Sequence, residues 1–93
     1  MSQALRGCRT RTSHITATTK VAQLVSKDPS RICVFLYNNG SVTVYILSAQ
    51  NLDAADGIPV AAGGTYKNDT TTAALWIVAA SGTADVRVQV DGD

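Results

Sequence analysis

Apolar and polar residues alternate most regularly near the C-terminal end of the chain. Val86, Val88 and Val90 are separated by single polar residues, which is the period of a β-strand with one face on a core. Residues 31–37 differ, because their apolar run is almost continuous, and this is typical of a strand that is covered on both faces. The two patterns predict two strands in different surroundings.

Asparagine, glycine, proline and serine mark the breaks between the predicted strands. Residues 38–41 read Asn-Asn-Gly-Ser, and Asn-Gly accepts the positive φ angles of a tight turn. We therefore predict a hairpin that joins a strand over 31–37 to a strand over 42–47. Pro59 cannot donate a hydrogen bond to a ladder, so residues 58–60 are predicted to form a short edge strand.

The remaining segments have weaker patterns. Residues 15–26 are rich in Thr and predict one strand, or two with a kink, and a helix over 20–26 is the alternative. Residues 65–67 and 73–80 predict further strands. Residues 1–14 are polar and basic and show no periodicity.

About six to eight short strands, with turn signals every 8–12 residues or so, predict an all-β fold. We expect a single small, jelly-roll-like β-sandwich over residues 15–93 and an extended N-terminal arm over residues 1–14, with a small barrel as the alternative. The composition agrees, since the chain has eleven Thr and no Glu. A domain of this size buries only about 60–65% of its unfolded surface, so a partner subunit would add stability.

Positive charge is concentrated in the first third of the chain. Residues 1–31 carry six Lys and Arg against one Asp, a balance of +5, whereas residues 32–93 carry two against six, a balance of −4. We expect the arm to bind an acidic protein surface, and the alternative is a solvated terminus with incidental charge. Five net charges would give only weak, salt-sensitive binding to nucleic acid, so we do not expect that partner. The residues expected to contact the partner are Arg6, Arg9, Arg11 and Lys20.

Groups suited to catalysis or metal binding are sparse. His14 is the single histidine, and the sequence shows no companion that would orient it as a base or complete a metal site. Asp53 and Asp56 precede Gly57, but an EF-hand calcium loop needs a distal Glu, which the chain lacks. We therefore expect no enzyme activity, no metal and no cofactor, and we interpret the aspartates as part of an ordinary loop.

Cys8 and Cys33 are 25 positions apart, a spacing that matches no thioredoxin or zinc motif. We expect Cys33, within its apolar run, to be a buried inert thiol and Cys8 to be an exposed thiol on the arm. A disulfide between them stays open. No segment approaches the roughly 20 apolar residues of a membrane span, so we expect no membrane partner.

The aromatic residues could pack in the core or present flat rings to a ligand. Tyr37 and Trp76 lie in strongly apolar strands, where packing is the expected role. Tyr66 lies beside Lys67 in a weaker strand, so these two residues are predicted to form an exposed contact surface. Stacking against sugar rings or bases is an alternative role for such tyrosines and for the tryptophan.

From Arg31 onward the order of strands and turns resembles the small β-sandwich virion proteins of tailed bacteriophages. The resemblance covers roughly residues 31–90 and consists of turn types and strand faces, with no catalytic motif. The motifs that carry it are Arg-Ile-x-Val at 31–34, Leu-Tyr-Asn-Asn-Gly-Ser at 36–41, Val-Tyr-Ile at 44–46, Gly-Ile-Pro-Val at 57–60, Gly-Gly at 63–64, Leu-Trp-Ile-Val-Ala at 75–79 and Ser-Gly-Thr-Ala-Asp-Val-Arg-Val at 81–88.

The resemblance implies a structural role at the surface of a virion. We expect a capsid decoration (cement) protein that binds the major capsid protein, or another virion protein, as a homo-oligomer, with a trimer favoured. The alternatives are a neck, tail or fibre component of the virion and a stand-alone carbohydrate-binding β-sandwich. The N-terminal 30 residues match no family pattern.

Overall fold

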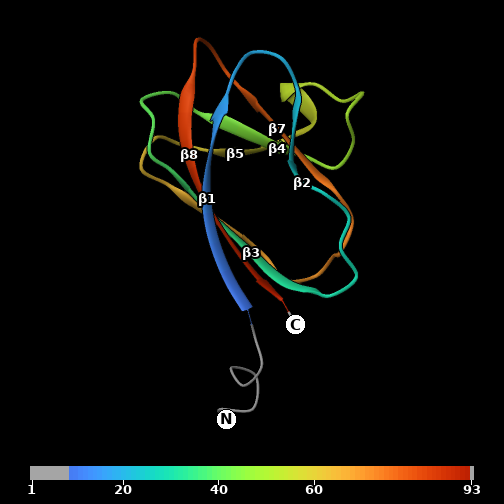
Figure 1. The fold of residues 1–93 in the computed structure, drawn as a ribbon. Helices are drawn as coiled ribbons and strands as arrows, with labels where there is room; N and C mark the ends of the chain where they lie inside the picture. Colours follow the sequence, from blue (N-terminus) through green and yellow to red (C-terminus); the bar gives the residue numbers. More distant parts are fainter. Residues whose placement is uncertain (1–8, 93) are drawn as a thin grey trace.

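The computed structural model describes residues 9–92, which form two antiparallel four-stranded sheets packed face to face (Figure 1). The first, here called the long sheet, contains, in spatial order, β1 (Arg9–Ala17), β8 (Ala84–Gly92), β3 (Arg31–Asn38) and β6 (Thr65–Asn68). The second, here called the short sheet, contains β2 (Ala22–Val25), β7 (Leu75–Ala79), β4 (Val44–Leu47) and β5 (Ile58–Val60). A 3₁₀ turn, η2 (Ala54–Asp56), precedes β5.

The strands pair in a nested order. β1 pairs with β8, β2 with β7, β3 with β6 and β4 with β5, as if one long hairpin had been rolled up. Every connection except that from β4 to β5 passes from one sheet to the other. This is the strand order of an eight-stranded jelly roll, and it confirms the predicted all-β sandwich.

The core lies between the two sheets and is built from small aliphatic side chains. Alternate residues of β8 point inward as the sequence predicts, since Val86 is fully buried, Val88 is nearly so and Val90 packs against the same cluster. Other members from the two sheets are Val34, Leu36, Val44, Ile46, Ile77 and Ala79. Val and Ala supply most of the core cluster, with Leu36, Ile46 and Ile77 as its larger members.

The predicted hairpin at residues 38–41 is wrong. β3 lies in the long sheet and β4 in the short sheet, so the segment between them is a crossing and not a hairpin turn. Neither Asn39 nor Gly40 has a positive φ angle. Gly40 is needed for a different reason, because a Cβ there would lie 2.8 Å from the backbone of Ala84.

Two further differences concern the first half of the chain. Residues 9–14, assigned to the arm from sequence, form the first part of β1 and pair with β8. Their side chains are all exposed, so they show no apolar alternation for a sequence pattern to detect. Residues 15–26 divide between β1 and β2, and the alternative helix over 20–26 does not form.

The apolar run of β3 is covered on one face only, which corrects the expectation of two buried faces. Val34 and Leu36 are fully buried, whereas Phe35 and Tyr37 are each 38% exposed on the opposite face. Pro59 lies in β5 at the edge of the short sheet, as predicted.

Candidate functional site

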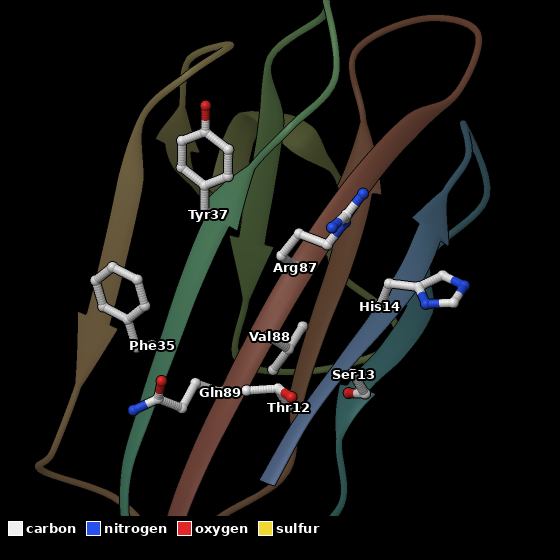
Figure 2. Close-up of a pocket in the computed structure, with 8 residues that line it drawn as sticks. All are labelled: Thr12, Ser13, His14, Phe35, Tyr37, Arg87, Val88 and Gln89. Atoms are coloured by element: carbon white, nitrogen blue, oxygen red, sulfur yellow. The ribbon is translucent and has the colours of Figure 1, made fainter. Parts of the chain in front are cut away.

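The outer face of the long sheet carries two aromatic residues beside a group of polar ones. Tyr37, Arg87 and His14 lie opposite one another on β3, β8 and β1. Phe35, Gln89 and Thr12 form the next row along the same strands. Figure 2 shows the six side chains of these two rows, here called the outer-face cluster. These residues line a shallow hollow of about 420 Å³.

The register of the sheet explains why these residues meet. Residues that oppose one another on neighbouring strands point to the same face, and so do residues two positions apart on one strand. Val86, Val88 and Val90 therefore face the core, while Arg87 and Gln89 face outward. Phe35 and Tyr37 share one face of β3 and lie about 6.6–6.8 Å apart along the strand.

The positive charges near this hollow have acidic partners. Arg87 donates to Asp85 from Nε at 3.0 Å, and its Nη2 lies 2.9 Å from the same carboxylate. The amide of Asn39 also donates to Asp85, at 3.1 Å. The hydrogen bonds from Arg87 and Asn39 lower the pKa of Asp85. Lys67, on β6 beside Phe35, lies 4.0 Å from Asp69.

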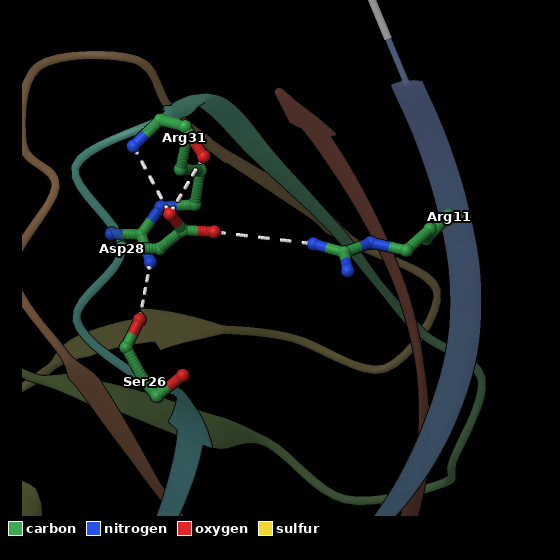
Figure 3. Close-up of polar contacts among 5 residues, drawn as sticks. Arg11, Ser26, Asp28 and Arg31 are labelled. Carbon is green, nitrogen blue, oxygen red and sulfur yellow. Dashed lines mark hydrogen bonds and ion pairs between the residues drawn. The ribbon is translucent and has the colours of Figure 1, made fainter. Parts of the chain in front are cut away.

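The basic residues predicted to bind a partner do not form one patch. Arg9 and Arg11 lie at the start of β1, whereas Lys20 follows the other end of that strand, about 26 Å away along it. Arg6 lies outside the described residues. Figure 3 shows Arg11 extending from β1 towards Asp28 in the loop between β2 and β3, with a separation of 4.0 Å.

Asp28 also organises its own loop. Its carboxylate accepts hydrogen bonds from the hydroxyl of Ser30 at 2.8 Å and from the backbone N–H of Ser30 at 3.0 Å. These two bonds, with a smaller contribution from Arg11, lower the pKa of Asp28. The carboxylate thus holds the loop in shape and also lies within ion-pair distance of the exposed Arg11.

Arg31 is a structural residue, a role that neither its charge nor its place in the Arg-Ile-x-Val motif indicated. Its side chain is buried and donates to the backbone carbonyl of Ser26 at 2.8 Å (Figure 3). It also donates to the backbone carbonyls of Thr71 and Ala73, at 3.1 and 2.6 Å. These carbonyls belong to the loops that follow β2 and β6. Arg31 therefore joins two loops at one end of the sandwich.

Tyr66 and Lys67 point to opposite faces of β6. Tyr66 is half-buried, packs against the core and accepts a hydrogen bond from Asn68 at 3.1 Å. Lys67 is exposed on the outer face, opposite Phe35. Tyr37, for which the sequence predicted packing, is the more exposed of the two tyrosines.

The Asp53 and Asp56 loop uses its carboxylates locally. The side chain of Asp53 accepts from the N–H of Ala55 at 3.0 Å, and that of Asp56 accepts from the N–H of Asp53 at 3.2 Å. This is a capping box around η2. Among residues 9–92, no group of three or more His, Cys, Asp and Glu side chains is arranged to hold a metal ion.

Cys33 is half-buried in β3, less deeply than the sequence suggested, and it is a free thiol. Partial burial raises the pKa of this thiol. Cys8 lies outside the described residues. No helix in the described part of the chain is long and apolar enough to cross a membrane.

Sequence reasoning missed the outer-face cluster. The sequence does contain three pairs of residues that are two positions apart and would therefore share one face of a strand: Phe35 and Tyr37, Arg87 and Gln89, and Thr12 and His14. This spacing does not say which strands are neighbours in the sheet. The pairing of β1 with β8 and of β8 with β3 brings the three pairs together.

Comparison with known proteins gives relatives by fold and none by sequence. No protein-family model matches the chain, and no curated protein matches it. Among solved structures, the stem and receptor-binding domain of the spike protein P1 from bacteriophage PM2 superimposes with a TM-score of 0.63 and 18% identity, over 78% of this chain and 29% of that one. A protein of Bacillus endospore appendages, described as disulfide-linked pili, superimposes with a TM-score of 0.50 and 18% identity, over 91% of this chain and 85% of that one.

These likenesses establish the fold. The chain is a small sandwich of a kind that also occurs in a phage spike and in a spore appendage, and both of those proteins are structural. The chain spans less than a third of the length of the phage spike chain, so the matching part is one portion of a longer protein there.

Proposed function

We propose that this chain is a structural protein of a tailed-bacteriophage virion, and specifically a capsid decoration (cement) protein. The observation that carries the proposal is the fold, which is similar over 78% of the chain to part of a phage spike protein. The resemblance of residues 31–90 to tailed-phage sandwich proteins supports the same class. The proposed partner is the major capsid protein, and the proposed location is the capsid surface.

β1 is the element best suited to dock on a shell. It is an edge strand of the long sheet, so one side of its backbone has no neighbouring strand among residues 9–92. Arg9 and Arg11 are exposed, lie two residues apart and point to the same face of β1. An acidic partner surface would bind both, in competition with Asp28 for Arg11. Lys20, at the far end, would join the contact only if the partner covered the whole strand.

A neck, tail or fibre component of the virion is the second candidate. It is supported by the phage spike, in which a sandwich similar to this one makes up part of a longer chain. A stand-alone carbohydrate-binding module is the third, and it is supported by the exposed aromatic pair Phe35 and Tyr37.

Labelling of assembled particles tests the location. We expect gold-labelled antibody against the protein to decorate the heads of purified virions in electron micrographs. Label confined to necks, tails or fibres would replace the decoration role with the second candidate. Absence of the protein from purified virions, measured by mass spectrometry, would overturn the virion assignment altogether.

Charge-removal variants test the docking strand. We expect Arg9→Ala with Arg11→Ala to weaken co-sedimentation with parent-phage capsids by about tenfold, since each lost ionic contact removes a fraction of a kcal/mol to about 1 kcal/mol. The control is Ser81→Asp with Thr83→Asp, which changes the net charge equally at an exposed turn. Equal weakening by both pairs would show that net charge, and not β1, governs binding.

A further inference from the structure

We propose that the outer-face cluster is a binding site for a neutral oligosaccharide, with sugar rings stacked on Phe35 and Tyr37. This inference does not depend on the virion assignment, because it follows from the composition of the hollow in Figure 2. It rests on the exposed aromatic pair that supports the third candidate function and deepens that candidate by naming the site and the class of sugar, so it can fail while the virion assignment stands.

Phe35 and Tyr37 form the apolar part of the site, here called the floor. Phe35 and Tyr37 are each 38% exposed, although they lie in an almost continuous apolar run of β3. Large apolar side chains on a sheet face gain stability when they are covered, at about 25 cal/mol for each Å² removed from water. Two rings about 6.6–6.8 Å apart along a strand can each lie against one ring of a short saccharide chain.

Polar side chains surround this floor on one side. His14, Arg87, Gln89 and Thr12 come from β1 and β8 and follow the aromatic pair in the same two rows. They supply ring nitrogens, a guanidinium, an amide and a hydroxyl, which together can donate to and accept from sugar hydroxyls. Ligand pockets commonly combine aromatic lining with a few polar groups of this kind that fix orientation.

Charge pairing favours a neutral ligand. Arg87 is held by Asp85 at 2.9 Å, and Lys67 lies 4.0 Å from Asp69, so neither cation near the floor is left without an acidic neighbour. An acidic polysaccharide or a nucleic acid would have to compete with these carboxylates. A neutral saccharide needs only the rings and hydrogen bonds.

The size of the patch favours a small ligand over a second copy of the chain. A stable protein interface covers about 800 Å² on each partner. The two aromatic side chains that line this hollow, Phe35 and Tyr37, are already more than half covered. The hollow of about 420 Å³ lies within the range of small-molecule sites, which is about 300–1,000 Å³.

Nuclear magnetic resonance with defined sugars tests the proposal. The probes are neutral trisaccharides built from glucose, mannose, galactose or N-acetylglucosamine. We expect saturation transfer from the protein to at least one of them, and shifts of the backbone amides of Phe35, Tyr37 and Gln89 during titration. Raising the salt concentration about tenfold should change the affinity less than twofold, because the contact is not ionic.

Matched variants locate the site. Phe35→Thr with Tyr37→Thr keeps residues that suit strands and should lower the affinity at least tenfold. Ile58→Thr removes an exposed apolar side chain from the other sheet and should leave the affinity within twofold. If the double variant loses its dispersed amide spectrum, Gln89→Ala replaces it, with an expected loss of about threefold to tenfold.

Three outcomes would overturn the proposal. The first is the absence of saturation transfer to every neutral trisaccharide at millimolar concentration. The second is an affinity that the aromatic variants leave unchanged. The third is preferential binding of an acidic oligosaccharide or an oligonucleotide that is lost at high salt, which would show that charge governs this face.

Discussion

The side chain of Asn38 makes three hydrogen bonds where the chain leaves the long sheet. Its amide nitrogen donates to the carbonyls of Val42 and Val60 at 2.8 and 3.0 Å, and its amide oxygen accepts from the N–H of Gly40 at 3.0 Å. The residue is fully buried, so each of these bonds replaces one to water. Asn38 therefore fixes the crossing to the short sheet and also ties it to β5.

Replacing this residue tests that role. Asn38→Ala would leave two carbonyls and one N–H without their partner, so we expect the free energy of unfolding to fall by about 2–4 kcal/mol. Urea denaturation measures the loss. Asn39→Ala is the matched control, because Asn39 is exposed and water can replace its hydrogen bond to Asp85, so we expect a loss of about 1 kcal/mol or less. Similar losses for the two variants would contradict the role given to Asn38.

Two carboxylates give the molecule a defined acid sensitivity. Asp28 and Asp85 have lowered pKa values, the first mainly through Ser30 and the second through Arg87 and Asn39. A lowered pKa in the folded state stabilises the fold above the ordinary pKa, and this contribution is lost as the pH falls through the folded value. Both effects therefore disappear below about pH 4.

Thermal melting between pH 7 and pH 2 measures the loss of stability that we expect when Asp28 and Asp85 are protonated. We expect the melting temperature of the parent protein to fall below about pH 4, and Asp85→Asn to show a shallower fall because it has no proton to gain. Asp53→Asn is the comparison, because it removes one carboxylate from the exposed cap of the 3₁₀ turn. A parallel acid profile for parent and Asp85→Asn would count against the interpretation of Asp85.

At the scale of elements, the sequence predicted strands better than it predicted their partners. β3, β5, β7 and β8 were recognisable because burial or proline leaves a local trace in each. The strand that pairs with β3 could not be recognised in the same way. Asn-Gly is compatible with a hairpin turn and also with a connection between the two sheets that is held by the side chain of Asn38. Pairing in a jelly roll joins distant segments, so no local pattern records it.

β1 is a strand whose first part cannot be recognised from its own sequence, because it has no buried alternate residues. Its first six residues are exposed and polar, and they are held by backbone pairing to β8 along the whole strand. The outer-face cluster was hidden for the same reason, because part of it lies on β1. Both features become visible only when β8 is known to be the neighbour.

Amide exchange distinguishes a paired strand from a free arm. In residues 9–14 we expect alternate amides to exchange at least tenfold more slowly than those of the exposed residues Gln50 and Asn51, since every second N–H of an edge strand points at its neighbour. Hydrogen exchange followed by nuclear magnetic resonance provides the rates. Uniformly fast exchange from Arg9 to His14 would mean that this segment is not paired in solution.

At the scale of the whole molecule, the sandwich is small, its core is built mainly of Val and Ala, and each sheet has two edge strands among residues 9–92. β1 and β6 border the long sheet, and β2 and β5 border the short one. Edges of this kind can pair with other chains, and a core of small aliphatic residues gains from further burial. Self-association would pair the open edges and bury more apolar surface, and we therefore propose a trimer.

Light scattering after size-exclusion chromatography tests the assembly. We expect a molar mass three times that of the chain, constant across about a hundredfold range of concentration, if the protein forms a closed ring. Mass that rises steadily with concentration would indicate open-ended association. A monomer at every concentration would contradict the trimer, and it would leave capsid docking to be tested by co-sedimentation.

Arg9 lies opposite Gly92, so the two ends of the described chain are side by side at one end of the sandwich (Figure 1). A module with adjacent entry and exit points can be spliced into a surface loop of another protein without stretching that loop apart. The opposite end, with the turn between β7 and β8, would then face outward, away from the host. The jelly roll therefore has a geometry that suits insertion into another protein. A peptide grafted into the exposed turn around Gly82 would be displayed at the end of the sandwich far from the insertion point.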